Sequence, residues 1–475
     1  MRNQSPKPAA ETDSGPATGR PRAPGGAANT RPLWQTYLAF LGPMVLANIL
    51  QSLSGSVNAV YIGQMLGTPA LAAVAGMFPV VFFFIALIIG VGAGASVLIG
   101  QAWGAREPHK VKAIAGTALA LGGGIGLAAA VLGELFARTA LTALGTAPEL
   151  LPDAVAYARV MMLSMPFLLV FILFTQLLRG VGDTVTPLFA LMLSTSVGLL
   201  LTPALIRGWG GLPQLGVVSA AVAGLASFIV ALVFLWFYLR RKQHPLAPDA
   251  ELLRALRVNP TLLRAVLRIG VPTGVQMVTI AMAELAILGL VNGYGADATA
   301  AYGAVNQIVN YVQFPALSIA ITASILGAQA IGAGRSDRLG AIVRTGLLLN
   351  VVFTGSLVVL GYLLSGWLLG FFLTTPHVLT MAQTLLHVML WASVVFGMQA
   401  VVAGVMRASG TVWVPTCISV ASILLVQLPA AHWLSARYGL QGVWMSYPVV
   451  FCVMLALQSA FYLLVWRYRK IERLV

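Results

Sequence analysis

Hydrophobic residues are grouped along this chain into long blocks that polar and charged residues interrupt only briefly. Twelve blocks lie between Leu33 and Trp466, and each is long enough to form the helix of about 20 residues that crosses a hydrocarbon core. Their approximate bounds are 35–62, 69–103, 110–136, 150–178, 186–206, 215–239, 264–292, 298–332, 340–370, 378–406, 412–434 and 441–466. The pattern predicts an all-α polytopic membrane protein with twelve transmembrane helices. The longest blocks, such as 69–103, exceed one bilayer crossing and should tilt or project from the membrane.

The composition and the placement of charge support a membrane protein. Of the 475 residues, 59% are hydrophobic and 9% are charged, whereas soluble globular chains carry about a quarter charged residues. The net charge of +15 could indicate a nucleic-acid partner, but the positions of the basic residues favour another interpretation. If the N-terminus is cytoplasmic, 24 of the 28 lysines and arginines lie on the cytoplasmic side, as the positive-inside rule requires. We therefore expect both termini in the cytoplasm and no nucleic-acid partner.

An internal repeat divides the chain. The stretch ASVLIGQAWGAREPHKV, at 95–111, is echoed by ASILGAQAIGAGRSDRL, at 323–339, which places Gln101 and Gln329 at an interval of 228 (329 − 101). The stretches LLRGVGDTVTP and VMRASGTVWVP place Arg179 and Arg407 at the same interval. Unrelated motifs at one interval indicate a duplication. Because six spans intervene, the sequence predicts two parallel six-helix repeats, an architecture that allows two bundles to rock about a central cavity.

The repeat also predicts the domain boundaries. We expect a disordered cytoplasmic tail over 1–32, rich in Pro, Gly, Ala and Thr, an N-lobe over 33–240 and a cytoplasmic linker over 241–263. A C-lobe over 264–467 and a basic cytoplasmic tail over 468–475 follow. The basic linker should carry a short amphipathic helix on the membrane surface.

Several of these motifs together resemble those of the multidrug and toxin extrusion (MATE) transporters, within a wider group that includes flippases for lipid-linked saccharides. The resemblance covers residues 33–466 and rests on GQAWGA and AQAIGAG, which end the second and eighth spans, on RGVGDT and RASGT after the fourth and tenth, and on LPQLGVVSAA at the start of the sixth. It implies a monomer with two six-helix lobes. It also implies export of lipophilic, often cationic, compounds that is driven by inward movement of protons or sodium.

Glu284 is the acid that the pattern places deep in a span, in VQMVTIAMAELAILGLV. Burying a charge in hydrocarbon costs several kcal/mol, so such a residue usually marks a transport path or an ion-coupling site. Glu284 could exchange a proton for a cationic substrate or help to bind sodium. The alternative is that it only keeps a water-filled cavity polar, or forms a hydrogen bond while protonated.

Five polar residues in the spans are further candidates for ion coupling or substrate binding beside Glu284. They are Asn58, Gln276, Asn306, Asn310 and Gln399. Asn306 and Asn310 are four residues apart and share a helix face, where hydrogen bonding between helices explains them equally well.

The N-lobe departs from the family pattern. Many relatives have an aspartate late in the first helix, where this chain has Asn58. The polar pair that relatives have at the end of the fifth helix corresponds here to Gly198 and Thr202. Another branch has an acid in the tenth helix, at the position of Phe396. These departures put ion coupling through the N-lobe in doubt and leave Glu284 as the preferred site.

The repeated motifs at the helix ends have a structural interpretation. Arg179 and Arg407 lie at predicted cytoplasmic helix ends, where a cation complements the helix dipole. Gln101 and Gln329 should satisfy backbone or loop groups at the same level, and a role in substrate binding is the alternative.

The sequence therefore predicts a secondary active antiporter in the cell inner membrane that exports amphipathic, cationic compounds by alternating access. Its expected partners are a small-molecule substrate and membrane lipid, with a proton or sodium ion for coupling and no other cofactor or metal. One alternative is a flippase for lipid-linked precursors, which would need a cationic cavity that the spans do not offer. Another is a membrane-embedded enzyme, for which the five histidines are too dispersed. A channel or receptor would not require the duplicated lobes.

Overall fold

The computed structural model describes residues 32–143 and 145–475, so the predicted tail over 1–32 lies outside the described residues except for Pro32. Within the described residues, the regular structure is entirely helical. Twelve candidate membrane spans occur in this part of the chain, and each coincides with a predicted block. The fold class and the twelve predicted helices are confirmed.

The N-lobe contains the first six spans. They are α1 (Leu33–Leu66), α2 (Thr68–Gly76) with α3 (Phe78–Gly104), α4 (Pro108–Ala143), α5 (Leu151–Gly180), α6 (Val185–Arg207) and α7 (Ser219–Arg241). The long block 69–103 is divided at Met77, between α2 and α3, because Gly76 weakens the helix and Pro79 cannot donate a backbone hydrogen bond. This block is therefore formed by two helices and not by one long tilted helix.

The C-lobe contains the other six spans. They are α9 (Pro260–Asn292), α10 (Ala296–Gly332), α11 (Leu339–Leu363), α13 (Pro376–Ala408), α14 (Trp413–Ser422) with α15 (Leu428–Tyr438), and α16 (Leu440–Leu464). A π-helical segment, Ile423–Gln427, joins α14 to α15, and the short α12 (Ser365–Gly370) follows α11.

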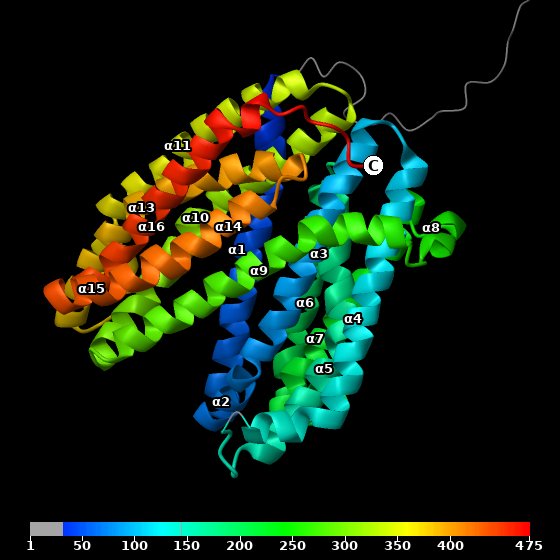
Figure 1. The fold of residues 1–475 in the computed structure, drawn as a ribbon. Helices are drawn as coiled ribbons and strands as arrows, with labels where there is room; N and C mark the ends of the chain where they lie inside the picture. Colours follow the sequence, from blue (N-terminus) through cyan, green and yellow to red (C-terminus); the bar gives the residue numbers. More distant parts are fainter. Residues whose placement is uncertain (1–31, 144) are drawn as a thin grey trace, which may run out of the picture.

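The two lobes approach each other at one end of the molecule and diverge towards the other (Figure 1). We call the end at which α1 begins and α16 ends the terminus end, and the opposite end, near α2 and α15, the distal end. The lobes cross where α3 packs on α9. A Cβ atom on Gly90 would lie 2.4 Å from the carbonyl oxygen of Gly270, and one on Gly94 would lie 2.4 Å from that of Val266. Glycine is needed at both positions for the two backbones to pack this closely.

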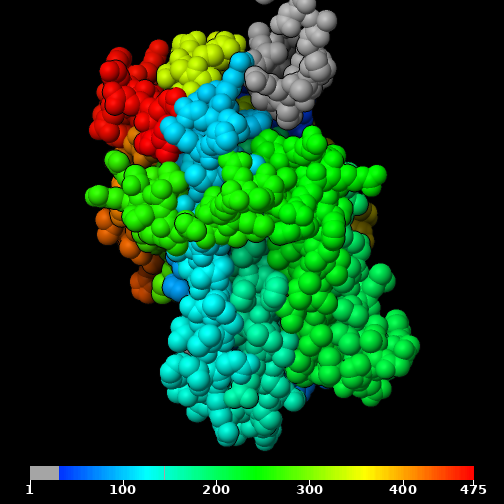
Figure 2. Space-filling view, turned by 90° about the vertical axis from the view of Figure 1, so that its right-hand side faces the viewer, coloured from blue at the N-terminus to red at the C-terminus, as the bar shows by residue number. Residues whose placement is uncertain are grey.

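The linker between the lobes contains the short helix α8 (Ala250–Ala255), which lies over the terminus half of α4. Asp249 caps α8 by accepting a hydrogen bond of 2.9 Å from the backbone nitrogen of Leu252. Lys112 of α4 donates to Asp249, and also to Glu251 at 2.8 Å. Figure 2 shows this green region lying across the cyan helices of the N-lobe. The ion pairs fasten the linker to one lobe.

Candidate functional site

Glu284 lies in α9, eight residues before the helix ends at Asn292, which places it about 12 Å from the distal end of the helix. Its carboxylate oxygen Oε2 accepts hydrogen bonds from the hydroxyls of Tyr302 in α10, at 2.6 Å, and Tyr447 in α16, at 2.9 Å. The two hydroxyl oxygens are themselves 2.8 Å apart. Three helices of the C-lobe therefore meet at one carboxyl group, which lies in the distal half of α9.

Aromatic packing holds the two tyrosines in place. The ring of Tyr302 stacks on Trp444, with centroids 5.3 Å apart and planes 6° from parallel. Trp444 and Tyr447 are three residues apart in α16, so they share a helix face. All three aromatic side chains are at least 96% buried. The hydroxyls thus have little freedom to leave Glu284.

This arrangement can exchange a proton or hold a cation. The ionised carboxylate accepts from two hydroxyl donors, and the protonated acid can donate to a tyrosine oxygen instead. In the part of the chain that the structure describes, no hydrogen bond is made to the other carboxylate oxygen, Oε1. That oxygen is available to a proton, a cation or water.

One of the five predicted polar partners lies close to this cluster. Asn306 lies one turn along α10 from Tyr302 and shares its helix face. Asn310 is a further turn away and is exposed. Gln276 lies two turns before Glu284 in α9, and Gln399 is buried in α13. Among the described residues, none of these last three hydrogen-bonds to the cluster, because they lie at other levels or on another helix.

Asn58 also lies apart from the Glu284 cluster. Its Oδ1 is buried and has no hydrogen-bond partner among the described residues. The N-lobe reaches α10 through an earlier part of α1, where Ser52 accepts a hydrogen bond of 3.3 Å from Gln307 and donates one of 3.4 Å to Tyr311. The six residues that we expected to act together are therefore distributed over two lobes.

The repeated glutamines connect the lobes at the terminus end. Gln101, at the end of α3, donates from Nε2 to the carbonyl oxygen of Ala408 at 2.8 Å. Gln329, at the end of α10, donates to the carbonyl oxygen of Gly180 at 3.2 Å. Each glutamine thus binds the last residue of a helix in the opposite lobe. Two backbone carbonyls at the ends of helices are satisfied by these reciprocal contacts.

Glycines and the C-terminal segment complete this contact, which we call the terminus-end closure. A Cβ atom on Gly104 would lie 2.1 Å from the carbonyl oxygen of Gln329, and one on Gly332 would lie 1.9 Å from that of Gln101. The backbone nitrogen of Leu474 donates to Oε1 of Gln101 at 2.8 Å. Arg473 pairs with Glu107 at 2.8 Å. The end of the chain is thereby fastened to the N-lobe.

The two repeated arginines make no such contact between lobes. Arg179 donates to Gln176, one turn earlier in the same helix, at 3.2 Å. Arg407 forms no hydrogen bond or ion pair with any residue that the structure describes. Both arginines lie in the last turn of a helix, where their charge complements the helix dipole.

Tyr447 and Trp444 were missed by reasoning from the sequence. Tyr447 is 163 positions from Glu284 and lies in an apolar span of ordinary appearance. The available signal was the acid itself, since a carboxyl group in a span requires hydroxyl or amide partners from neighbouring helices.

Twelve spans, two lobes that meet at one end and a partly buried acid in one lobe define the class as a membrane transporter built from two repeats. The family model MatE matches residues 43–204 and matches again over residues 272–433. The chain belongs to the MatE family of multidrug and toxin extrusion transporters. The resemblance noted in the sequence is confirmed.

Individual relatives agree with this assignment. The chain is 40% identical over 445 residues to the probable multidrug resistance protein YoeA of Bacillus subtilis, covering 93% of this chain and 96% of the relative. It is 27% identical over 404 residues to a FAD transporter of Shewanella oneidensis, covering 85% and 89% of the two chains. A crystal structure of a mutant of the Vibrio cholerae MATE transporter VcmN shares the fold, with a TM-score of 0.85, 18% identity, and coverage of 92% and 98%.

Proposed function

We propose that this protein is a secondary active exporter of amphipathic, cationic organic compounds that exchanges them for protons, with sodium as the alternative coupling ion. The observation that carries the proposal is the Glu284 carboxyl, which two tyrosine hydroxyls hold in the C-lobe with one oxygen available. An inward proton would neutralise Glu284, and a cationic substrate would be favoured when the group is ionised. The name of the relative YoeA supports drugs as the substrate class.

The proposal assigns the terminus end to the cytoplasm of the cell, with the protein in the inner membrane as a monomer. The basic residues of the linker and the C-terminal segment support this orientation. In the conformation described here, the terminus-end closure would seal the cytoplasmic side. Alternating access would then require the bonds of Gln101 and Gln329 to break in each cycle. The proposal requires no cofactor besides the coupling ion and no enzymatic step.

An anionic substrate is the second candidate, because one relative is named a FAD transporter. A site for a phosphate-bearing molecule would need basic side chains in the inner parts of the spans. Arg159 lies within a described span, but it pairs with Glu134 at 3.5 Å near the distal end. This distribution favours a cationic substrate over an anionic one or a lipid-linked saccharide.

The experiment measures ethidium efflux in membrane vesicles under imposed proton or sodium gradients. Glu284→Gln should abolish the acceleration by the gradient, and the gradient that drives the wild-type protein identifies the ion. Glu134→Gln is a matched control, since Glu134 lies nine residues from the distal end of α4 and Glu284 lies eight from that of α9. Undiminished gradient-driven efflux in Glu284→Gln would contradict coupling at this residue. Absence of efflux in the wild-type protein under both gradients would contradict the substrate class.

A further inference from the structure

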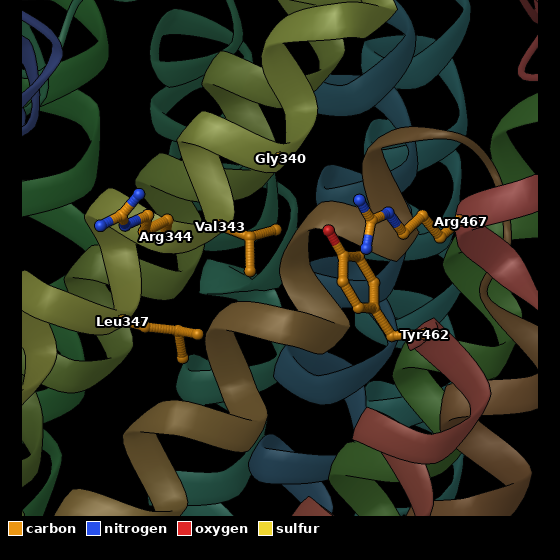
Figure 3. A pocket seen from close by; sticks show the side chains of 6 residues that line it. All are labelled: Gly340, Val343, Arg344, Leu347, Tyr462 and Arg467. Atoms are coloured by element: carbon orange, nitrogen blue, oxygen red, sulfur yellow. The ribbon is translucent and has the colours of Figure 1, made fainter. Parts of the chain in front are cut away.

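A groove of about 410 Å³ lies on the C-lobe near the terminus end, far from Glu284. Gly340, Val343, Arg344 and Leu347 of α11 line one side, and Tyr462 and Arg467, at the end of α16 and just after it, line the other. Both α11 and α16 pack against α13. Figure 3 shows Arg344 at one edge and Tyr462 with Arg467 at the other, with Val343 and Leu347 between them. The groove is therefore apolar in the middle and basic at both edges.

The polar groups at these edges have no partners within the part of the chain that the structure describes. Arg344 and Arg467 are exposed, and neither forms an ion pair or a hydrogen bond with a described residue. The hydroxyl of Tyr462 has no hydrogen-bond partner there either, and the guanidinium of Arg467 lies beside it. Nearby acids do not neutralise the groove, since Glu472 pairs with Lys470 at 3.4 Å and Asp337 is not part of the lining. Two cations and a hydroxyl donor remain free for an anion.

The wall that carries Tyr462 is held in place before any ligand binds. The ring of Tyr462 stacks on Trp466, with centroids 5.2 Å apart and planes at 24°. Trp466 is 97% buried, and its indole nitrogen donates to the hydroxyl of Ser409 at 3.0 Å. Ser409 follows the last residue of α13. The groove thus lies between α11 and α16, with one wall fixed to the end of α13, and binding there would not have to order a mobile side chain at Tyr462.

The level of the groove matches the headgroup region of a bilayer. Arg344 is the sixth residue of α11, and Arg467 lies three residues beyond the end of α16. Both guanidinium groups are therefore near helix ends, while Leu347 lies about one turn further towards the hydrocarbon. A ligand that carries an anionic group and an aliphatic chain would match the two parts of the groove.

From these features we propose that the groove binds an anionic phospholipid, with the phosphate at Arg467, Tyr462 and Arg344 and an acyl chain along Val343 and Leu347. Basic pockets between membrane helices recognise anionic headgroups through the same chemistry. Since α11 and α16 flank α13 on this face, the bound lipid joins the outer helices of the C-lobe where the terminus-end closure forms. The site is separate from the proposed path of protons and substrate.

Native mass spectrometry of the purified full-length protein tests this inference with two lipids that have identical acyl chains. Phosphatidylglycerol should bind at lower concentrations than phosphatidylcholine. The double variant Arg344→Gln/Arg467→Gln should lose this preference. Each substitution should weaken the affinity for phosphatidylglycerol by about fivefold. Arg241→Gln is the matched control, because Arg241 is an exposed arginine at the terminus end of α7 and does not line the groove. An unchanged preference in the double variant would overturn the proposal.

A second variant blocks the groove without changing charge. A Cβ atom on Gly340 would meet no atom within 4 Å, so the ring in Gly340→Phe can occupy the groove without displacing a helix. It should weaken the binding of phosphatidylglycerol although both arginines remain, and unchanged binding would count against this location. Inorganic phosphate provides the last arm of the test. If millimolar phosphate displaces phosphatidylglycerol from the wild-type protein, the site is one for a soluble anion and the lipid assignment is wrong.

Discussion

The two copies of the repeat make equivalent contacts at the terminus end of the molecule but carry different residues in its distal half. At the terminus end, Gln101 and Gln329 make the same contact in opposite directions, and Gly104 and Gly332 allow the same close approach. In the distal half, Glu284 is bound by two tyrosines, whereas the position one repeat earlier in α1, at the interval of 228, is Ser56. The terminus-end closure depends on both halves of the chain equally. The acid and its two tyrosine partners lie in the C-lobe.

The largest effect is expected from the glycines of the terminus-end closure. The added methyl group in Gly332→Ala would overlap the backbone of Gln101, and no side chain can move to relieve this overlap. The lobes must separate, so the closed state is lost and transport should fall by about tenfold or more. Gly104→Ala should do the same, and efflux in vesicles measures both. Gly303→Ala is the control, since a Cβ atom there meets nothing within 4 Å. If Gly332→Ala and Gly104→Ala lowered transport to very different extents, the two halves would not contribute equally to the terminus-end closure.

The assignment of the acid chemistry to the C-lobe is tested by removing one tyrosine hydroxyl. Tyr447→Phe keeps the packing but deletes one of the two donors to Glu284. A hydrogen bond to a charged group contributes about 1.5–3 kcal/mol, so gradient-driven efflux should fall by roughly tenfold or more. In the N-lobe, Ser56→Ala at the corresponding position should leave efflux within about twofold, because Ser56 is exposed and donates to the backbone carbonyl of Ser52 in its own helix. A comparable loss in Ser56→Ala would show that the N-lobe shares the chemistry.

A smaller effect is expected from the glutamines themselves. Gln101→Ala and Gln329→Ala each leave one carbonyl at a helix end without its partner, which costs about 1–3 kcal/mol where water cannot replace the bond. Gln101→Ala should be the more destabilising, because Gln101 also accepts from Leu474. Thermal unfolding in detergent measures the two losses. Deleting residues 469–475 should lower the stability of the wild-type protein but have less effect in Gln101→Ala, and full additivity would contradict the contact with Leu474.

The smallest effect concerns the linker, which ion pairs with Lys112 fasten to the N-lobe. Hydrogen bonds from Lys112 and His109 hold the pKa of Glu251 below its usual range. A lowered carboxyl pKa means that the stabilisation is complete above the ordinary pKa of about 4.3 and is lost as the pH falls through the lowered value. Because Glu251 is largely solvated, the effect should be under about 1 kcal/mol. Limited proteolysis at pH 7 and at acid pH should show a linker that is cut faster in acid, and in Glu251→Gln this difference should shrink.

The sequence predicted the fold well because hydrophobicity acts over whole helices. The twelve spans and the repeat follow from the length and spacing of apolar blocks and from paired motifs such as those around Gln101 and Gln329. The break at Met77 and the π-helical segment Ile423–Gln427 were not predicted, since they depend on local packing and not on block length.

The candidate site was predicted only in part. Glu284 stands out because an acid in an apolar span is costly, and Asn306 lies one turn from its partner Tyr302 in α10. Gln276, Asn310 and Gln399 were grouped with it on polarity alone. Which polar groups meet depends on the rotation and level of each helix, and no single span of sequence contains that information. The contact of Tyr447 with Glu284 is an example, since it joins the seventh span to the twelfth.

The crossed glutamine bonds have a consequence for the origin of the chain. In a symmetric dimer of a six-helix ancestor, one glutamine in each subunit would reach the same carbonyl in the other, so a single residue would supply both bonds. A surface of this kind is self-complementary, and gene fusion could join the two subunits without redesigning it. Once joined, each copy would be free to change on its own. An acid with tyrosine partners could then arise in one half, while the contact between the lobes would continue to need both.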